Sequence, residues 1–184
     1  MTPGLDHRTT SSSTVAAVSR RVVATHLPIP LVLGFGNVLL ADDGAGVHLM
    51  AALRAELATS AYAVECVDGG TLSFSLLPYL EATDSLLVVD AANLQLSAGA
   101  VQLFEGVDMD ELLKSSRRRS VHEVGLIDLL DMARVQGSLP ARRALLCIQP
   151  GVIDWGEMLS PPVSAALPEA KRLALELLCR WRSE

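Results

Sequence analysis

The sequence predicts an α/β protein with a twisted, mostly parallel five-stranded sheet sandwiched between helices, in three layers. Two observations predict this class. Short apolar runs alternate with longer segments of helical period, which is typical of a parallel or mixed sheet between helix layers. One run, SLLVVDA at residues 85–91, is nearly all apolar, as expected for a central strand covered on both faces.

Five segments are expected to form the strands of this sheet. They are residues 31–36, 62–67, 85–91, 100–105 and 144–150. Residues 100–105 alternate between apolar and polar and follow Gly99, which predicts an edge strand. The other segments are short apolar runs that would be buried in the sheet.

Four segments have the pattern of helices. They are residues 44–57, a short segment at 71–80, residues 121–134, and a last helix opened by Pro168. The third helix has a strong start signal, because Ser120 and Glu123 form a capping box. The last helix carries one apolar stripe, made of Ala170, Leu173, Ala174, Leu177, Leu178 and Trp181.

Length and composition indicate one domain. The chain has 184 residues, of which 50% are hydrophobic, enough for a sizeable core. We expect residues 29–184 to form this domain and residues 1–28, a Ser/Thr-rich polar stretch, to be a disordered tail or the product of a start assigned too early. A net charge of −6 argues against a general nucleic-acid binder.

The sequence also indicates where the protein works. No apolar run reaches the roughly 18 residues that a membrane span needs, and the start of the chain lacks the apolar region of a secretory signal. Cys66, Cys147 and Cys179 form no CxxC pair and lie in apolar segments, so we expect buried free thiols in a reducing cytoplasm. We expect a cytoplasmic monomer without membrane insertion.

Carboxylates gather where the predicted strands end. Asp42 and Asp43 follow the first strand, Asp68 ends the second and Asp90 ends the third. In an open α/β sheet, ligands bind outside the carboxyl ends of the strands. His122 adds an imidazole at a helix N-terminus, where the helix dipole disfavours the imidazolium and leaves the neutral form that binds metals. Carboxylates and one neutral imidazole would make an oxygen and nitrogen site for a divalent ion.

Each of these residues also has a simpler interpretation. Asp42 is a plausible helix cap, and Asp43 would favour the same helix dipole. Asp68 precedes two glycines and could form a turn, and His122 could lie on the surface of its helix. Asp90 could cap or position the loop that follows its strand. Spacing alone is weak support for a metal site, because the ligands come from distant segments.

Other catalytic patterns fit less well. The sequence has no GxSxG elbow and no HExxH helix. The turn at Gly34 and Gly36 lacks the third glycine of a dinucleotide loop, since Leu39 stands there, and it has no phosphate-binding lysine. A dinucleotide enzyme is therefore a distant alternative, which a cofactor titration would test.

Several blocks resemble the signature blocks of the [NiFe]-hydrogenase maturation endopeptidases. They are GFGNVLLADDGAGV, DGGT at 68–71, SVHEVGLIDLL at 120–130, IQP at 148–150 and LSPPV at 159–163. The resemblance covers roughly residues 30–182 and implies the twisted sheet between helices. It also implies removal of a C-terminal extension from the hydrogenase large-subunit precursor after nickel insertion.

The resemblance implies a role for three residues. Asp43, Asp68 and His122 match the family's nickel-recognising positions, so they would bind the nickel that the precursor carries, with no organic cofactor. The first position is often Glu in the family, and Asp43 keeps the carboxylate but is shorter by one methylene. We expect Asp42 and Asp90 to support these ligands without binding the ion.

Two other functions stay open from the sequence. One is a non-proteolytic chaperone that checks the precursor for nickel. The other is an aspartic-type peptidase that uses a dyad drawn from Asp42, Asp43 and Asp68 and needs no metal.

The predicted tail gives a direct test. A chain that begins at Ile29 should keep the melting temperature and the activity of the full chain, because residues 1–28 lack apolar periodicity. Thermal unfolding of the two chains measures this, and a large drop in melting temperature would show that the tail belongs to the core.

Overall fold

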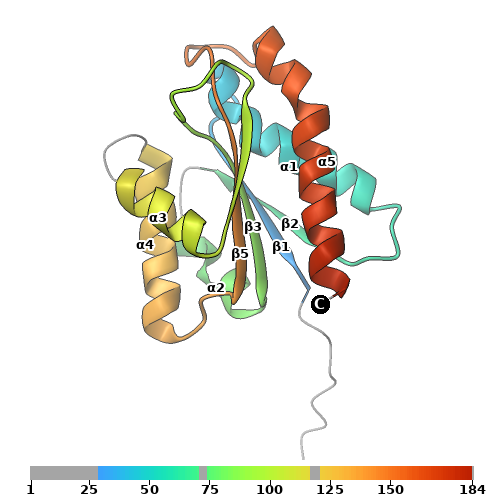
Figure 1. The fold of residues 1–184 in the computed structure, drawn as a ribbon, viewed down its shortest axis with the longest axis vertical. Coiled ribbons are helices and arrows are strands. Elements are labelled where there is room, and N and C mark those ends of the chain that lie inside the picture. The colour runs from blue at the N-terminus through green and yellow to red at the C-terminus, as the bar shows by residue number, and fades with distance from the viewer. Residues whose placement is uncertain (1–28, 71–73, 117–120, 184) are drawn as a thin grey trace, which may run out of the picture.

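The computed structural model describes residues 29–70, 74–116 and 121–183, with the backbone alone for residues 74, 115–116 and 121–124. In chain order the elements are β1 (Leu31–Phe35), the 3₁₀ helix η1 (Ala41–Gly44), α1 (Ala45–Leu57), β2 (Glu65–Gly70), η2 (Phe74–Leu76), α2 (Leu77–Glu81), β3 (Ser85–Ala91), β4 (Val101–Glu105), α3 (Val107–Ser116), α4 (Val121–Gln136), β5 (Arg142–Ile148) and α5 (Pro161–Ser183) (Figure 1).

The sheet has five strands in the order β2-β1-β3-β5-β4. All neighbouring pairs are parallel except β4 with β5, which is antiparallel. The predicted mostly parallel sheet and the edge position of residues 100–105 are confirmed.

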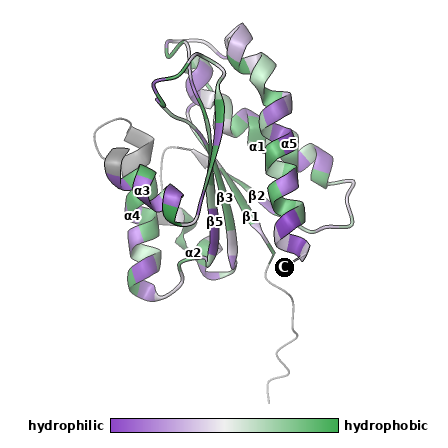
Figure 2. Ribbon diagram, in the orientation of Figure 1, coloured by the Kyte–Doolittle hydropathy of each residue, from purple (hydrophilic) through white to green (hydrophobic). Residues whose placement is uncertain are grey.

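Two apolar cores lie on opposite faces of the sheet. Along β3, Leu86 and Val88 belong to one core, while Leu87 and Val89 belong to the other. Helices α2, α3 and α4 cover the first face, and α1 and α5 cover the second (Figure 1). Figure 2 shows the same arrangement as predominantly hydrophobic inner strands between helices of mixed character. The predicted three layers follow from this alternation.

Helix α3 was not predicted, β5 begins and ends two residues before its predicted bounds, and two other boundaries were further off. The second strand spans Glu65–Gly70 rather than residues 62–67, so Asp68 lies within it. The last helix begins at Pro161, seven positions before Pro168. Ser160 precedes this helix, and its carbonyl accepts the backbone N–H of Ser164 at 2.8 Å.

Pro168 is tolerated inside α5 because it lies on the exposed side of the helix. A proline cannot donate to the carbonyl four residues earlier, here that of Ser164, which is also exposed and open to water. The predicted apolar stripe is confirmed from Ala170 to Trp181, and buried Val163 and Ala166 extend it toward the helix start.

Several expectations lie outside the described residues. They concern the tail at 1–28 and the capping box of Ser120 and Glu123. The three cysteines are free, but only Cys147 is buried, so the expectation of three buried thiols was wrong. Within the described part of the chain, no helix has the length and apolar character to cross a membrane.

Helix α1 can approach the sheet closely at Gly46 because this residue has no side chain. A Cβ atom there would lie 2.3 Å from the carbonyl oxygen of Phe35 and 2.4 Å from that of Val89. Both neighbours are backbone atoms of buried strands, so neither can move easily. Gly46, in the block GFGNVLLADDGAGV, thus allows close helix–strand packing, a use that needs no nucleotide.

Replacing Gly46 by alanine should lower the free energy of unfolding by about 3 kcal/mol, because the added methyl overpacks α1 against β1 and β3. Urea denaturation measures the change. Gly137→Ala is the matched control: its φ is +74° but its surroundings are open, so it should cost only about 1 kcal/mol. A stabilising Gly46→Ala, as helix propensity alone predicts, would contradict this packing.

Candidate functional site

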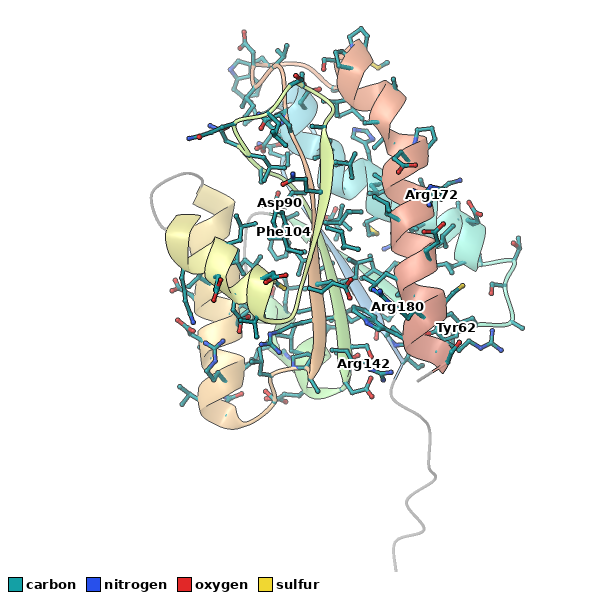
Figure 3. The ribbon with its side chains drawn as sticks, viewed as in Figure 1. Tyr62, Asp90, Phe104, Arg142, Arg172 and Arg180 are labelled. Atoms are coloured by element: carbon teal, nitrogen blue, oxygen red, sulfur yellow. The ribbon has the colours of Figure 1, made fainter. Side chains whose placement is uncertain are left out.

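The predicted acidic residues lie at the carboxyl ends of neighbouring strands: Asp42 and Asp43 follow β1, Asp68 lies in the last half of β2, and Asp90 is the next-to-last residue of β3. Because β2 and β3 lie on opposite sides of β1, the chain reverses its direction of growth there, and the crevice between β1 and β3 is the usual ligand position of such a sheet. The short helix η1, which carries Asp42 and Asp43, follows β1 at this position. Figure 3 shows Asp90 on β3 and Arg142 at the opposite, amino end of β5.

Asp42 is completely buried and holds the segment between β5 and α5. Its Oδ2 accepts the N–H groups of Gly151 and Val152, both at 2.8 Å, and its Oδ1 accepts the N–H of Ser160 at 2.6 Å. The Ser160 hydroxyl donates to Oδ2 as well, at 2.7 Å. Neither η1 nor α1 has a side-chain cap, so the interpretation of Asp42 as the cap of its own helix was wrong.

The hydrogen bonds to Asp42 decide its charge state. Burial raises the pKa of this carboxyl, but the bonds from Ser160, Val152 and Gly151 outweigh it and hold the pKa below its usual value. Asp42 is therefore an anion at neutral pH, and its partners stabilise that charge.

The backbone just before Asp42 is strained. Ala41 has a φ of +47°, a left-handed conformation that is uncommon for any residue other than glycine. The N–H of Ala41 donates to the carbonyl of Gly156 at 2.6 Å, and that of Asp42 donates to Val152 at 3.1 Å. These bonds hold η1 to the segment after β5 and keep the strained turn in place.

The segments that carry Asp43 and Asp68 meet at Gly36. The N–H of Gly36 donates to the carbonyl of Gly70 at 3.3 Å, and a Cβ on Gly36 would lie only 2.0 Å from the carbonyl oxygen of Asp43. Since φ of Gly36 is +132°, glycine is required there for both reasons. The structure therefore brings the two acidic segments to the same end of β1.

Both carboxylates are held by nearby backbone N–H groups. Asp43 is largely buried, and its Oδ2 accepts the N–H of Asn37 at 2.9 Å. Asp68 is exposed, and its Oδ1 accepts the N–H of Gly70 at 2.8 Å. The bond of Asp68 is that of a turn-forming aspartate, as its simpler interpretation predicted. Each of these bonds fixes the orientation of its carboxylate.

Asp90 is buried at the end of β3, and the loop after it is held by a residue that sequence reasoning missed. The Oε1 of Gln149 accepts the N–H groups of Leu94 at 2.7 Å and Leu96 at 3.3 Å. Gln149 and Ser160 both fall in sequence blocks of the family resemblance, IQP and LSPPV. That was the only signal for them, because neither stands in a chemical motif.

His122 lies in the first turn of α4, and its side chain is outside the described residues. Helix α4 leads into the amino end of β5, which is parallel to β1 and β3. The first turn of α4 therefore lies toward the end of the sheet at which these parallel strands finish (Figure 1). Among the side chains that are described, no three His, Cys, Asp or Glu residues could hold a metal ion together. The grouping of Asp43, Asp68 and His122 stays a prediction.

Comparison with known proteins identifies the class of the molecule. Residues 47–177 match the family described as hydrogenase maturation protease. The chain is 34% identical over 156 residues to the hydrogenase expression/formation protein HoxM of Azotobacter vinelandii, covering 82% of this chain and 72% of that one. It is 32% identical over 149 residues to the hydrogenase 2 maturation protease of Escherichia coli strain K12, covering 80% of this chain and 89% of that one.

Solved structures agree with these relatives. The hydrogenase maturating endopeptidase HybD from E. coli superimposes with a TM-score of 0.75 at 29% identity, over 83% of this chain and 93% of that one. The [NiFe] hydrogenase maturation protease HybD from Thermococcus kodakarensis gives 0.69 at 29% identity, over 82% and 99%. The molecule is thus a peptide-bond hydrolase. It belongs to the hydrogenase maturation protease family.

Replacing Asp42 by asparagine should lower the free energy of unfolding by about 3 kcal/mol at neutral pH, because an amide nitrogen would face N–H donors that now bind an anion. The pKa of Asp42 is lower in the folded protein than in the unfolded chain. The stabilising effect of its charge is therefore fully present above the pKa of the unfolded state, and it is lost as the pH falls through the pKa of the folded state. The difference between wild type and Asp42→Asn should therefore be constant near neutrality and shrink below about pH 4.

Urea titrations at a series of pH values measure this difference. Asp128→Asn on the exposed side of α4 is the matched control and should change stability by less than about 0.5 kcal/mol. A variant Asp42→Asn as stable as wild type at pH 7 would contradict the anchoring role of Asp42.

Proposed function

We propose that this enzyme removes the C-terminal extension of the [NiFe]-hydrogenase large-subunit precursor after nickel has been inserted. Nickel bound in the precursor is the recognition element, and Asp43, Asp68 and His122 bind it. The enzyme acts as a cytoplasmic monomer and needs no organic cofactor. Membership of the maturation protease family supports the reaction class, and the resemblance of the sequence blocks supports the three residues.

The observation that carries this proposal is the meeting of two acidic segments at Gly36. Two carboxylates on adjoining segments, one buried and one exposed, suit a cation that arrives from outside on a protein substrate. The largely buried Asp43 is held in a fixed orientation by Asn37, and the exposed Asp68 is accessible to the precursor. His122, in the first turn of α4, would supply the nitrogen ligand.

The chemistry at this site has two possible courses. Nickel held by these residues would position the scissile region of the precursor, and it would then either polarise the scissile carbonyl or activate water. In both cases the enzyme's residues bind and orient the ion, and no serine or cysteine attacks the peptide.

The second candidate mechanism is a metal-independent aspartate dyad. It is restricted to Asp43 and Asp68, because the oxygens of Asp42 accept hydrogen bonds from Gly151, Val152 and Ser160. Two carboxylates of a dyad share one proton, and a carboxylate whose charge is stabilised by four donors is unsuited to that. The alternative of a non-proteolytic chaperone is disfavoured by relatives that are proteases.

The mechanism is tested with precursor that contains nickel and precursor that lacks it. Wild-type enzyme should shorten only the nickel-containing form, and inhibitors directed at serine or cysteine should have no effect. His122→Ala should abolish processing, and Asp68→Asn should slow it at least about tenfold, because each removes a ligand. Asp43→Glu should be the mildest change, since it keeps the carboxylate. Mobility of the precursor on a gel measures each rate.

Asp128→Asn is again the control for the loss of a carboxylate and should process the precursor at the wild-type rate. Circular dichroism of each variant should show an intact fold. Full processing by His122→Ala, or cutting of the nickel-free precursor by wild type, would refute the nickel-centred mechanism and favour the dyad.

A further inference from the structure

The segment between β5 and α5 exposes large apolar side chains. Residues 152–158, which we name the apolar loop, include Trp155 and Met158, whose exposed fractions are 81% and 82%. Val152 and Ile153 are 48% and 60% exposed. None of these four residues belongs to either core. An exposed apolar group of this size in a described part of the surface marks an interaction site, and tryptophan and methionine are enriched at protein interfaces.

The apolar loop is held in one conformation by its backbone. Gly156 both accepts from Ala41 at 2.6 Å and donates to the carbonyl of Leu39 at 3.0 Å. The carboxylate of Asp42 binds the N–H of Val152 at the start of the loop and that of Ser160 just beyond its end. A surface that is already ordered loses little conformational entropy when it binds a partner.

The apolar loop adjoins the candidate site through consecutive residues. Asp42, which anchors the loop, directly precedes Asp43. Val38 and Leu39 precede Leu40, which forms an isolated β-bridge with Gly156, and they are also exposed, at 38% and 47%. In Figure 1 the segment between β5 and α5 lies at the same end of the molecule as η1. A protein bound on this surface would have its neighbouring residues at the candidate site.

The charges of the apolar loop indicate the chemistry of the partner. Asp154 and Glu157 are exposed between its apolar residues, and residues 152–158 contain no Lys, Arg or His. A second copy of the chain would bring two acidic loops together, and an anionic lipid surface would be repelled in the same way. A partner segment that is apolar and carries Lys or Arg is complementary to the loop.

We infer that the apolar loop, together with Val38 and Leu39, docks the hydrogenase precursor through an apolar segment that carries basic side chains. This inference rests on the proposed function. It adds a binding surface outside the three nickel-binding positions, and it assigns to that surface affinity for the precursor rather than a part in bond cleavage.

The test compares wild type with the double variant Trp155→Ala/Met158→Ala and with Asp154→Lys/Glu157→Lys. For each, binding to immobilised nickel-containing precursor and the rate of processing at increasing precursor concentration are measured. Each double variant should weaken binding and raise KM about tenfold or more, with kcat within about twofold of wild type. Salt should weaken binding by wild type, because it screens the attraction of a basic partner to Asp154 and Glu157, and this effect should be reversed in the lysine variant.

Val135→Ala is the matched control, because Val135 is 89% exposed but lies on α4, at the end of the helix away from its first turn. It should leave both binding and KM unchanged. All the altered side chains are exposed, so melting temperatures should stay within a few degrees of wild type.

The outcomes separate this inference from the proposed function. If wild type processes the precursor and the double variants bind it as tightly as wild type does, the docking surface is wrong and the proposed function stands. If wild type neither binds nor cuts nickel-containing precursor, the proposed function is wrong and the docking inference falls with it. If sedimentation shows a wild-type dimer that Trp155→Ala/Met158→Ala dissociates, a second copy of the chain occupies the loop and the inference is overturned. Binding of wild type to anionic vesicles that the same variant abolishes would overturn it in favour of a membrane.

Discussion

The end of the molecule that carries the candidate site depends on one interaction, the hydrogen bonds to the buried carboxylate of Asp42. Asp42 joins segments more than 100 residues apart in the chain, since it follows β1 and binds both ends of the segment that links β5 to α5. A buried anion without hydrogen-bond donors would destabilise the fold, and the Asp42 carboxylate accepts four hydrogen bonds. Its bonds to Ser160 hold the start of α5, and Asp42 lies between the strained Ala41 and Asp43 in η1. Removing the charge would therefore affect the fold and the site together.

Much of the fold was predictable, because a strand that is covered on both faces of the sheet has a nearly continuous apolar sequence. Residues 85–91 were predicted to be a strand, and β3 spans the same residues, since every one of them is buried. The edge strand β2 was displaced by three positions, because its residues are mostly exposed or half-buried and have no clean alternation. The start of α5 was missed because proline is common at the first position of a helix, and this preference favoured Pro168 as the start. The buried Val163 and Ala166, which continue the apolar stripe, were the stronger signal.

The candidate site was predictable in its residue types but not in its connections. The acids at the strand ends could be found because ligands of α/β sheets bind there, and the position of Asp43 and Asp68 on segments that meet at Gly36 agrees with that rule. The hydrogen bonds that Asp42 accepts from Gly151 and Ser160, and those that Gln149 accepts from the loop after β3, could not be predicted. They join residues far apart in sequence, and no local pattern records which distant N–H groups a buried acceptor will meet. Family resemblance marked these positions, but it gave no physical reason for them.

The direct link from the apolar loop through Asp42 to Asp43 has a thermodynamic consequence. If binding at the apolar loop moves Asp42, it also changes the free energy of binding at Asp43. The change must be the same when the order is reversed, because the coupling free energy between two binding sites is reciprocal. A protein held by the loop would then change the affinity of the acidic site for an ion by the same factor by which the ion changes the affinity of the loop for the protein. Asp42 binds Gly151 and Ser160 and is the chain neighbour of Asp43, so a small shift at either N–H group has a short path to the acidic site that needs no change of fold. If the ion and the protein favour the same position of the link, recognition of the cargo and of its carrier is one cooperative event, and a carrier without cargo is held less firmly than one that is loaded.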